Sequence, residues 1–319
     1  MVSPNSPRTR AATGAVLAAV LWAFYYLFIL SLTPGTSTGA ILFYPFLIGG
    51  VAYSLLAFRE GHASVWASLW TDRDAWARIL LVVAMQGSVV AATFLDGPVD
   101  AALLSLLGDV VATPLLATLL FREHRGLWGR GAFVGGVVVC VLGGSLAVIG
   151  GSALTSPRGV GLPVAPAVPL AVALYFLATA RANRGAAPSA VVAHTMIGGA
   201  LLVGVATVLA PGGLRGLLSV SPADLGLLAA AGLTTFWIAP YLYFRAIQRV
   251  GLVLPALLMV GIPIVTLGLT AGVLHRFPSV LALVGVPVAI LGAAVAVAAE
   301  ASLDRSPPAP GGSTISSSR

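Results

Sequence analysis

The chain has 319 residues, of which 58% are hydrophobic and 8% are charged, and its formal net charge is +7. Because a soluble domain carries about 25% charged residues, this composition excludes a soluble protein and predicts an integral membrane protein. All 17 basic residues are arginines scattered between apolar runs, which excludes a nucleic-acid-binding patch, and the single Cys140 excludes an intrachain disulfide.

Ten apolar runs follow one another along the chain, and each is long enough to predict a membrane-spanning helix of about 20 residues. The runs are Ala12–Leu32, Ala40–Phe58, Ala77–Leu95, Ala101–Phe121, Leu127–Ile149, Pro163–Ala180, Pro188–Leu209, Leu225–Tyr243, Leu252–Leu274 and Val280–Ala299. The tails, residues 1–11 and 301–319, are rich in Pro and Ser and are expected to be disordered.

The arginines predict the orientation, because cytoplasmic loops of membrane proteins are enriched in basic residues. With the N-terminus inside, fourteen of the 17 arginines fall on inner segments, and only Arg158, Arg215 and Arg276 fall on outer ones. We therefore expect a multi-pass protein of the cell (inner) membrane with both termini in the cytoplasm. Arg245 and Arg249, in the turn after the eighth run, are interpreted as topology markers rather than substrate ligands.

An internal repeat is visible at a nearly constant offset. VLWAFYY around Trp22 resembles ALYFLAT around Tyr175 at an offset of 153 residues, and LIGG at 47–50 recurs as MIGG at 196–199 at an offset of 149. These matches predict two five-helix repeats over residues 12–150 and 162–300, joined by an outer linker over 151–161. Because five is odd, the second copy is inverted, so the expected fold class is an all-α membrane protein with ten transmembrane helices in two inverted repeats.

The C-terminal part carries a family resemblance. YLYFRAIQRVG, a helix with Pro263, and LHRFPSVLALVGVPVAILGAAVAV, in which Gly285 and Gly292 are seven apart, resemble the second repeat of the EamA-type, ten-helix branch of the drug/metabolite transporter (DMT) superfamily. His275 and Arg276 occupy positions where that family has Gly and Glu in a turn. This departure indicates a divergent member.

The first repeat is similar to the family through SLLGDVVATPLLATLLFREHRGLWGRGAFVGGVVVCVLGG. Glu123 stands in the position of the Glu of the family's Gly-Glu-Arg turn, and Gly136 and Gly143 are seven apart. The resemblance implies a ten-helix transporter of a small molecule, a metabolite or a drug, and favours export.

Asp109, near the middle of the fourth run, is the most informative side chain. A charged residue at mid-bilayer costs roughly 3 kcal/mol on insertion scales, so Asp109 is expected to face the protein interior or water. Ser105 and Thr113 lie four residues to either side of it and would complete a polar line. A substrate-amine ligand, a proton-coupling carboxylate and a structural hydrogen-bond partner all stay open as its role.

Other candidate residues come from aromatic and polar positions within the runs. The further candidates for substrate binding are Trp22, Tyr25, Gln86, Tyr175, Thr234 and Trp237. Packing and interfacial belts are the competing interpretation for the aromatic residues. His194 is a candidate proton carrier because histidine exchanges protons near neutral pH, with a structural hydrogen bond as the alternative.

The expected function is secondary transport by alternating access, with proton coupling open. No GxxxxGK[ST] motif is present, which argues against an ATP-driven motor. An intramembrane lipid-modifying enzyme is disfavoured because the HExxH motif is missing and the four histidines are scattered along the chain, and a non-transporting membrane assembly protein is a further alternative. No enzyme activity, cofactor or metal is expected; membrane lipid and a small-molecule substrate are the expected partners, and homodimerisation stays open.

Overall fold

The computed structural model of the chain describes residues 7–95, 97–121, 125–151, 166–251, 253–273, 275 and 279–302. Predictions that concern residues 151–161 fall almost wholly outside this part, and those that concern Glu123, Arg276 and the C-terminal tail beyond residue 302 fall wholly outside it. Residues 7–11, expected in the N-terminal tail, belong to the first helix instead.

Every element of the described part is a helix. In the first half the elements are α1 (Pro7–Leu30), α2 (Thr38–Arg59), α3 (Ala63–Ser68), η1 (Leu69–Thr71), α4 (Arg73–Leu95), α5 (Pro98–Leu107), η2 (Gly108–Ala112), α6 (Thr113–Phe121), α7 (Arg125–Trp128) and α8 (Gly131–Gly151). In the second half they are α10 (Ala167–Ala182), α11 (Pro188–Leu209), α12 (Gly213–Leu218), α13 (Pro222–Ala231), η3 (Gly232–Ile238), α14 (Ala239–Val250), α15 (Val253–Leu258), α16 (Gly261–Gly272) and α17 (Val280–Ala301).

Six helical stretches of the described chain are long and apolar enough to cross a membrane. They are Thr9–Leu30, Thr38–Arg59, Arg73–Leu95, Pro98–Leu120, Pro188–Leu209 and Pro222–Val250. Four shorter apolar helices, Gly131–Ala147, Ala167–Ala182, Gly261–Gly272 and Val280–Ala296, lie within the other four predicted runs, apart from Arg181 and Ala182 at the end of the second helix. The prediction of an all-helical membrane fold is therefore confirmed.

The helix starts follow local sequence signals. Pro98, Pro188 and Pro222 each stand in the first turn of a helix, where the missing backbone N–H costs nothing. Ser37 and Ser221 cap α2 and α13, because their hydroxyl oxygens accept backbone N–H groups three residues on at 3.2 and 3.1 Å.

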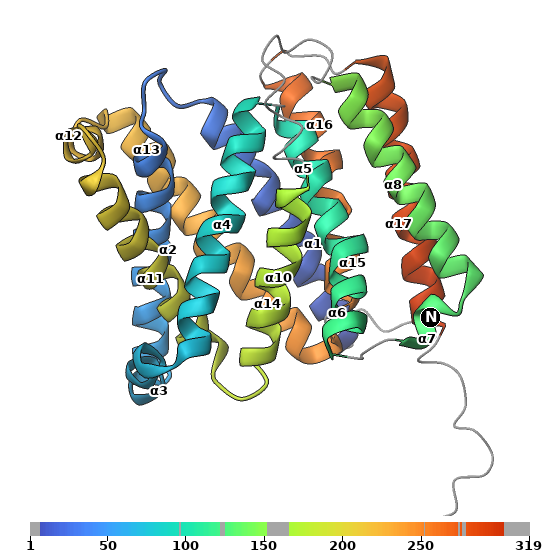
Figure 1. Cartoon of the computed structure of the whole chain (residues 1–319), viewed down its shortest axis with the longest axis horizontal. Helices are drawn as coiled ribbons and strands as arrows, with labels where there is room; N and C mark the ends of the chain where they lie inside the picture. Colours follow the sequence, from blue (N-terminus) through green and yellow to red (C-terminus); the bar gives the residue numbers. More distant parts are fainter. Residues whose placement is uncertain are drawn as a thin grey trace, which may run out of the picture.

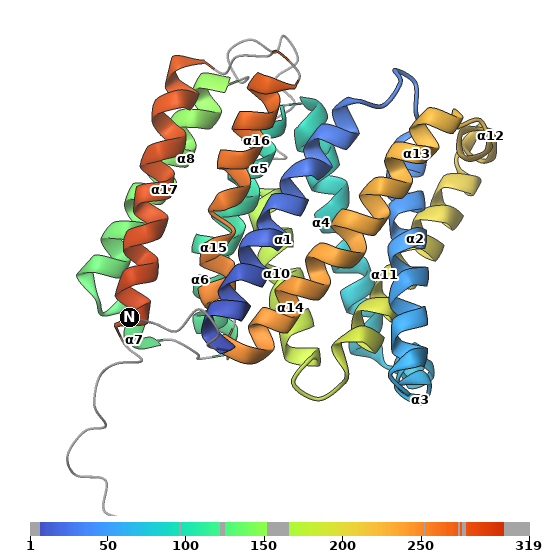
Figure 2. The ribbon, with the colours of Figure 1, turned by 180° about the vertical axis from the view of Figure 1, so that it is seen from behind.

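The helices form one bundle whose two ends differ in charge (Figures 1 and 2). The start of α1, the segments α3 and α7, and the end of α17 lie at the same end, and α12 lies at the other. The first end also holds Arg59 at the close of α2, Arg73 at the start of α4, Arg181 and Arg184 at the close of α10, and Arg245 and Arg249 in α14. We call it the arginine-rich end. The described residues of the opposite end include one arginine, Arg215 in α12.

At the opposite end, a hydrogen-bonded clasp joins the two halves of the chain. The carboxylate of Asp224, at the start of α13, accepts hydrogen bonds from the backbone N–H of Thr33 at 3.0 Å, its hydroxyl at 3.1 Å and the hydroxyl of Thr36 at 3.2 Å. Thr33 and Thr36 lie in the loop between α1 and α2. These bonds hold that loop against the second half.

Four glycines bring α8 and α17 into backbone contact. A Cβ atom on Gly143 would lie 2.8 Å from the carbonyl oxygen of Gly285, and one on Gly285 would lie 2.6 Å from the carbonyl oxygen of Gly143. Gly136 and Gly292 show the same reciprocity, at 2.7 and 2.6 Å. Because only glycine permits this approach, the spacing of seven residues is explained by helix packing.

The two copies of the repeated IGG sequence also meet each other, across α2 and α11. A Cβ atom on Gly50 would lie 2.9 Å from the backbone nitrogen of Ile197, and one on Gly199 would lie 3.2 Å from the ring of Phe46. Thus α2 and α11 pack directly together, as α8 and α17 do.

Two spans contain a π-helical segment, η2 in the fourth run and η3 in the eighth. Each begins at a glycine that touches another helix. A Cβ atom on Gly108 would lie 2.8 Å from Cβ of Val172, and one on Gly232 would lie 2.8 Å from Cβ of Ile48. A π-turn closes i→i+5 hydrogen bonds and so shifts the phase of the side chains that follow it.

Candidate functional site

A cavity of about 60 Å³ lies between the two halves of the bundle. Its walls come from α1, α4, α5 and η2 in the first half and from α10, η3 and α16 in the second. The described lining residues are Trp22, Tyr25, Tyr26, Met85, Gln86, Val89, Ser105, Asp109, Val172, Phe176, Thr235 and Ile262. We call this space the central cavity.

The size of the central cavity limits what this conformation can hold. One water molecule needs about 10–15 Å³ by the same measure, so about 60 Å³ has room for a few waters. An organic molecule would therefore need the aromatic walls to move apart.

Asp109 supplies the acidic group of this cavity. It lies in η2, is 3% exposed, and its Oδ1 atom makes no hydrogen bond within the described structure. Ser105, one turn earlier, donates to the carbonyl of Ala101 at 2.9 Å and lies 3.2 Å from the hydroxyl of Tyr26, which therefore donates to it. Buried polar atoms in folded proteins almost always have a hydrogen-bond partner, so an unpartnered carboxyl oxygen is unusual. This oxygen could take up a proton or accept a hydrogen bond from a water molecule or a ligand.

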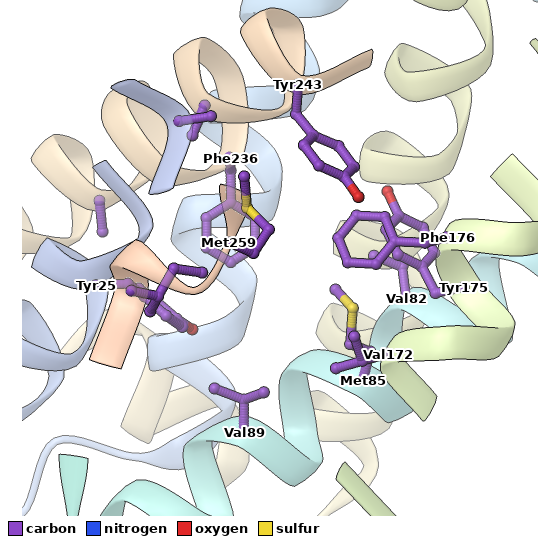
Figure 3. Close-up of a cluster of buried hydrophobic side chains, with 14 of the residues drawn as sticks. Tyr25, Val82, Met85, Val89, Val172, Tyr175, Phe176, Phe236, Tyr243 and Met259 are labelled. Carbon is purple, nitrogen blue, oxygen red and sulfur yellow. The ribbon is translucent and has the colours of Figure 1, made fainter. Parts of the chain in front are cut away.

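Aromatic rings form the opposite wall. The indole nitrogen of Trp22 donates to the carbonyl of Thr235 in η3 at 3.1 Å, which fixes the ring across the two halves. Trp22 lies 5.9 Å from Phe176 and 5.2 Å from Tyr243 between ring centroids. Figure 3 shows Phe176 and Tyr243 side by side, with the sulfur-bearing side chain of Met85 nearby. This surface suits a flat apolar group or, through the ring faces, a cation.

The two π-helical segments decide which predicted polar residues reach the cavity. Thr113 follows η2, donates to the carbonyl of Gly108 at 2.9 Å, and stands outside the described lining. In η3, Thr235 lines the cavity, whereas Thr234 donates to the backbone one turn earlier and Trp237 packs half-buried against the core. The prediction from sequence treats both spans as regular α-helices. A π-helical segment rotates the directions in which the side chains after it project from the helix axis.

Tyr175 and His194 lie in a second group of buried polar residues around Arg78. His194 is 0% exposed and its ring packs edge-on against Trp70, with 4.4 Å between the centroids. Neither ring nitrogen of His194 has a hydrogen-bond partner in the described part, so a structural hydrogen bond is not observed there. Tyr175 touches Phe176 at 5.2 Å but is not among the described residues that line the central cavity.

Arg78 is a residue whose importance the sequence reading missed. It was counted among the inner topology markers, yet it is 4% exposed inside the bundle. A signal was present, because Arg78 is the second residue of the predicted run Ala77–Leu95 rather than part of the preceding loop. Phe176 was also missed, since one aromatic residue in an apolar run carries no special pattern.

A second cavity, of about 190 Å³, opens at the arginine-rich end between α2, α11 and α14. Tyr53 and Phe244 are buried at its base, and Glu60 and Arg245 are exposed at its rim. Glu60 accepts a hydrogen bond from the hydroxyl of Ser189 at 2.6 Å. We call this space the vestibule.

A single layer of aromatic rings separates the vestibule from the central cavity. Phe176 lines the central cavity and Phe244 lines the vestibule, and their ring centroids are 6.2 Å apart. Tyr243 contacts both rings, at 5.1 and 5.6 Å. These three rings therefore lie between the two spaces. Among the described residues, no three His, Cys, Asp or Glu side chains gather as a metal-binding group.

Comparisons with known proteins agree with this architecture. Residues 159–298 match the model of the EamA-like transporter family. Among solved structures 21 chains match, and one crystal structure of a protein aligns with 92% of this chain and 98% of its own chain at a TM-score of 0.64 and 22% sequence identity. That likeness shows a shared fold over most of the chain. A search of curated proteins found no match.

Proposed function

Because this chain belongs to the EamA-like transporter family of the DMT superfamily, we propose that it is a secondary transporter that exports a small organic molecule by alternating access. The observation that carries the proposal is the placement of Asp109. Its buried carboxyl faces a cavity with aromatic walls, between the two halves of the bundle. An acidic residue within a membrane-spanning helix raises the free energy of membrane insertion. Such residues usually have a role in function.

Alternating access requires two halves that can rock about a central site, and the packing supports that geometry. The reciprocal contacts of Gly136 with Gly292 and of Gly143 with Gly285 are those expected of a two-fold axis that relates α8 to α17. Such an axis in the membrane plane relates inverted five-helix repeats and gives ten spans in total. The sequence offset of 149 residues between Gly136 and Gly285 equals that between the two IGG sequences.

The two ends of the bundle differ in a way that fits one state of this cycle. The vestibule lies at the arginine-rich end, while the clasp at Asp224 ties the halves together at the opposite end, where a further hollow of about 520 Å³ lies against α2, α11 and α12. The clasp must open, and the vestibule must close, when the central cavity turns to the other side. We place the arginine-rich end in the cytoplasm, because basic residues favour that side of the cell membrane, so the structure corresponds to an inward-facing, occluded state.

Asp109 has two roles open to it in such a transporter. As a carboxylate beside aromatic rings, it can bind the ammonium group of a substrate directly. As a group that gains and loses a proton between the two states, it can couple transport to the proton gradient. We propose the coupling role, because Oδ1 is buried and the described lining of the central cavity gives it no hydrogen-bond partner, so that protonation is the simplest way to offset the cost of its burial.

The function is tested by binding followed by transport. Purified protein is screened by thermal shift against metabolites and drugs, and each compound that raises the melting temperature is then tested by counterflow in proteoliposomes. Counterflow needs neither ATP nor an ion gradient, so a secondary transporter shows it with its own substrate. Compounds that bind at the central cavity but never exchange across the bilayer would point instead to a membrane assembly protein.

A further inference from the structure

The Arg78 cluster consists of Arg78 on α4, two residues of α10, the residue that caps the C-terminus of α10, and His194 on α11. Tyr175 and Thr179 lie in α10 and Asn183 caps it, and because the three are four residues apart they share one face at that end of the helix. All five are at least nine-tenths buried. Arg78 lies close enough to interact electrostatically with both Tyr175 and His194. Three helices thus converge on one buried positive charge.

Several hydrogen-bonding atoms of the Arg78 cluster have no partner in the described part of the chain. Within the described structure, no partner is found for Nε and Nη2 of Arg78, the amide of Asn183 or either ring nitrogen of His194, and the hydroxyls of Tyr175 and Thr179 lie within reach of each other alone. Buried polar groups in folded proteins are almost always hydrogen-bonded. So many unused donors at one place therefore indicate a group that binds there.

The nearest acidic residue does not use these donors. Oδ2 of Asp72 lies 3.8 Å from Nη2 of Arg78, which is longer than a hydrogen bond, and the Asp72 side chain is 43% exposed. The other oxygen of Asp72 accepts the backbone N–H of Asp74 at 3.0 Å at the start of α4. A guanidinium cannot lose its proton in a protein, and burying its positive charge without a well-paired anion is unfavourable. The charge of Arg78 would therefore be stabilised by a bound anion.

We propose that the Arg78 cluster binds the carboxylate group of a small organic monoanion, and that such molecules are the class this protein carries. Nε and Nη2 project from one edge of the guanidinium, and two parallel N–H donors match the two oxygens of a carboxylate. The hydroxyls of Tyr175 and Thr179 can donate to the same oxygens. Only one unit of negative charge is needed, because Asp72 already offsets part of the positive charge.

The location of the cluster connects it to the transport route. Tyr175 is followed on α10 by Phe176, which lines the central cavity and belongs to the aromatic layer. Tyr53, whose buried hydroxyl has no partner in the described residues, lines the vestibule. Figure 3 shows Tyr175 and Tyr243 beside Phe176, and their ring centroids lie 5.2 and 5.1 Å from the Phe176 ring. A carboxylate held at Arg78 therefore lies beside the aromatic layer between the two cavities.

The binding test uses the purified full-length protein in detergent, with sodium benzoate as the probe. At constant ionic strength, benzoate should raise the melting temperature in a concentration-dependent way, whereas benzamide, a neutral molecule of the same shape, should not. Inorganic phosphate is the third probe and should have a smaller effect than benzoate. Equal shifts from benzoate and benzamide, or a larger shift from phosphate, would overturn the carboxylate assignment.

Variants locate the site. Arg78→Gln should weaken benzoate binding by about tenfold or more, because it removes a charge-assisted pair of hydrogen bonds. Arg73→Gln, an exposed arginine five residues earlier on α4, is the matched control and should leave binding unchanged. Tyr175→Phe keeps the ring, should fold like the wild type, and should weaken binding by about two- to tenfold. Unchanged benzoate binding in both Arg78→Gln and Tyr175→Phe would contradict the proposal.

Asp72→Asn distinguishes a ligand site from a structural ion pair between Asp72 and Arg78. The two interpretations predict different changes in benzoate affinity and in melting temperature. If the cluster binds an anion, removing the neighbouring negative charge should tighten benzoate binding and leave the melting temperature of the free protein nearly unchanged. A lowered melting temperature without any response to benzoate would mean that Asp72 is simply the structural partner of Arg78, and the proposal would fail.

The assignment of the cargo rests on the transport function proposed above, and the binding assay does not. Benzoate counterflow in proteoliposomes that is present in the wild type and lost in Arg78→Gln would support both. Binding without counterflow of benzoate would remove monocarboxylates as the cargo. Counterflow of some other substrate would still uphold the transport function in that case, so the two ideas can fail separately.

Discussion

Substituting Gly143 by alanine should separate α8 from α17 and destabilise the protein. A Cβ atom at this position would lie 2.3 Å from the backbone nitrogen of Ala289 and 2.8 Å from the carbonyl oxygen of Gly285, whereas ordinary van der Waals contact begins at 3.4 Å. The contacted atoms are backbone, so no side chain can turn aside and the helices must move by about 1 Å. Overpacking of this kind costs about 1–3 kcal/mol, and we expect about 2 kcal/mol.

The matched control lies on the same helix. Gly135→Ala adds the same methyl group at a position with no atom within 4 Å, so it should be neutral or stabilise the helix by up to about 1 kcal/mol. Unfolding of both variants in detergent, followed by tryptophan fluorescence against denaturant, measures the difference. Equal stabilities for Gly143→Ala and Gly135→Ala would refute the inference that glycine is needed for this helix contact.

Three further predictions concern the cavity, the topology and the clasp. Trp22→Ala should weaken substrate binding in the thermal-shift assay while Phe24→Ala, on the same helix outside the described lining, should not; the reverse ranking would argue against the aromatic wall. With the native cysteine replaced by alanine, a cysteine at Gly185 should react with an impermeant reagent from the cytoplasm and one at Ser219 from outside, and the opposite pattern would invert the topology. Asp224→Ala should lower the melting temperature more than Asp224→Asn, because alanine loses all three hydrogen bonds from the α1–α2 loop; identical melting curves for both variants and the wild type would show that the clasp does not stabilise this state.

The apolar runs predicted the architecture well, for a plain physical reason. The bilayer core offers no water to the backbone N–H and C=O groups, so these groups must bond to one another. A helix does this within a single segment, and a long apolar run in a membrane is therefore expected to be helical. Composition therefore predicted the all-helical membrane fold, and six described stretches in the expected places are long and apolar enough to cross a membrane. The glycines at 136, 143, 285 and 292, noticed for their spacing and their family resemblance, turned out to be the contact points of one helix pair.

The details of the central cavity were harder to predict because side-chain phase is not visible in the sequence. Asp109 was singled out from the cost of burying a charge, which does not depend on phase, and it lines the cavity. Thr113 was predicted from its α-helical spacing to Asp109, but a π-helical segment lies between the two residues and Thr113 stands outside the described lining; Thr234, which lies in the other π-helical segment, also stands outside it. Nothing in the residue types of η2 or η3 indicates a π-turn.

Arg78 illustrates a different limit. An arginine near the start of a span is normally a topology marker that reaches the membrane surface with its long side chain. Whether it turns outward or into the bundle depends on the neighbouring helices, here α10 and α11, which are about a hundred residues away in sequence. The unused hydrogen-bonding atoms around it become apparent only when those helices are assembled.

Transport by wild type and Asp109→Asn in proteoliposomes, with and without a pH gradient, tests the central claim most directly. The substrate is one identified by counterflow, and Asp74→Asn, which alters an exposed carboxylate, is the control. We predict that Asp109→Asn abolishes gradient-driven transport while exchange at equal pH survives, because asparagine keeps the shape of the cavity but cannot carry the proton. Loss of both modes together would assign Asp109 to substrate binding instead. Normal activity of Asp109→Asn in both modes would contradict the account, because the buried carboxyl of the central cavity would then have no part in transport.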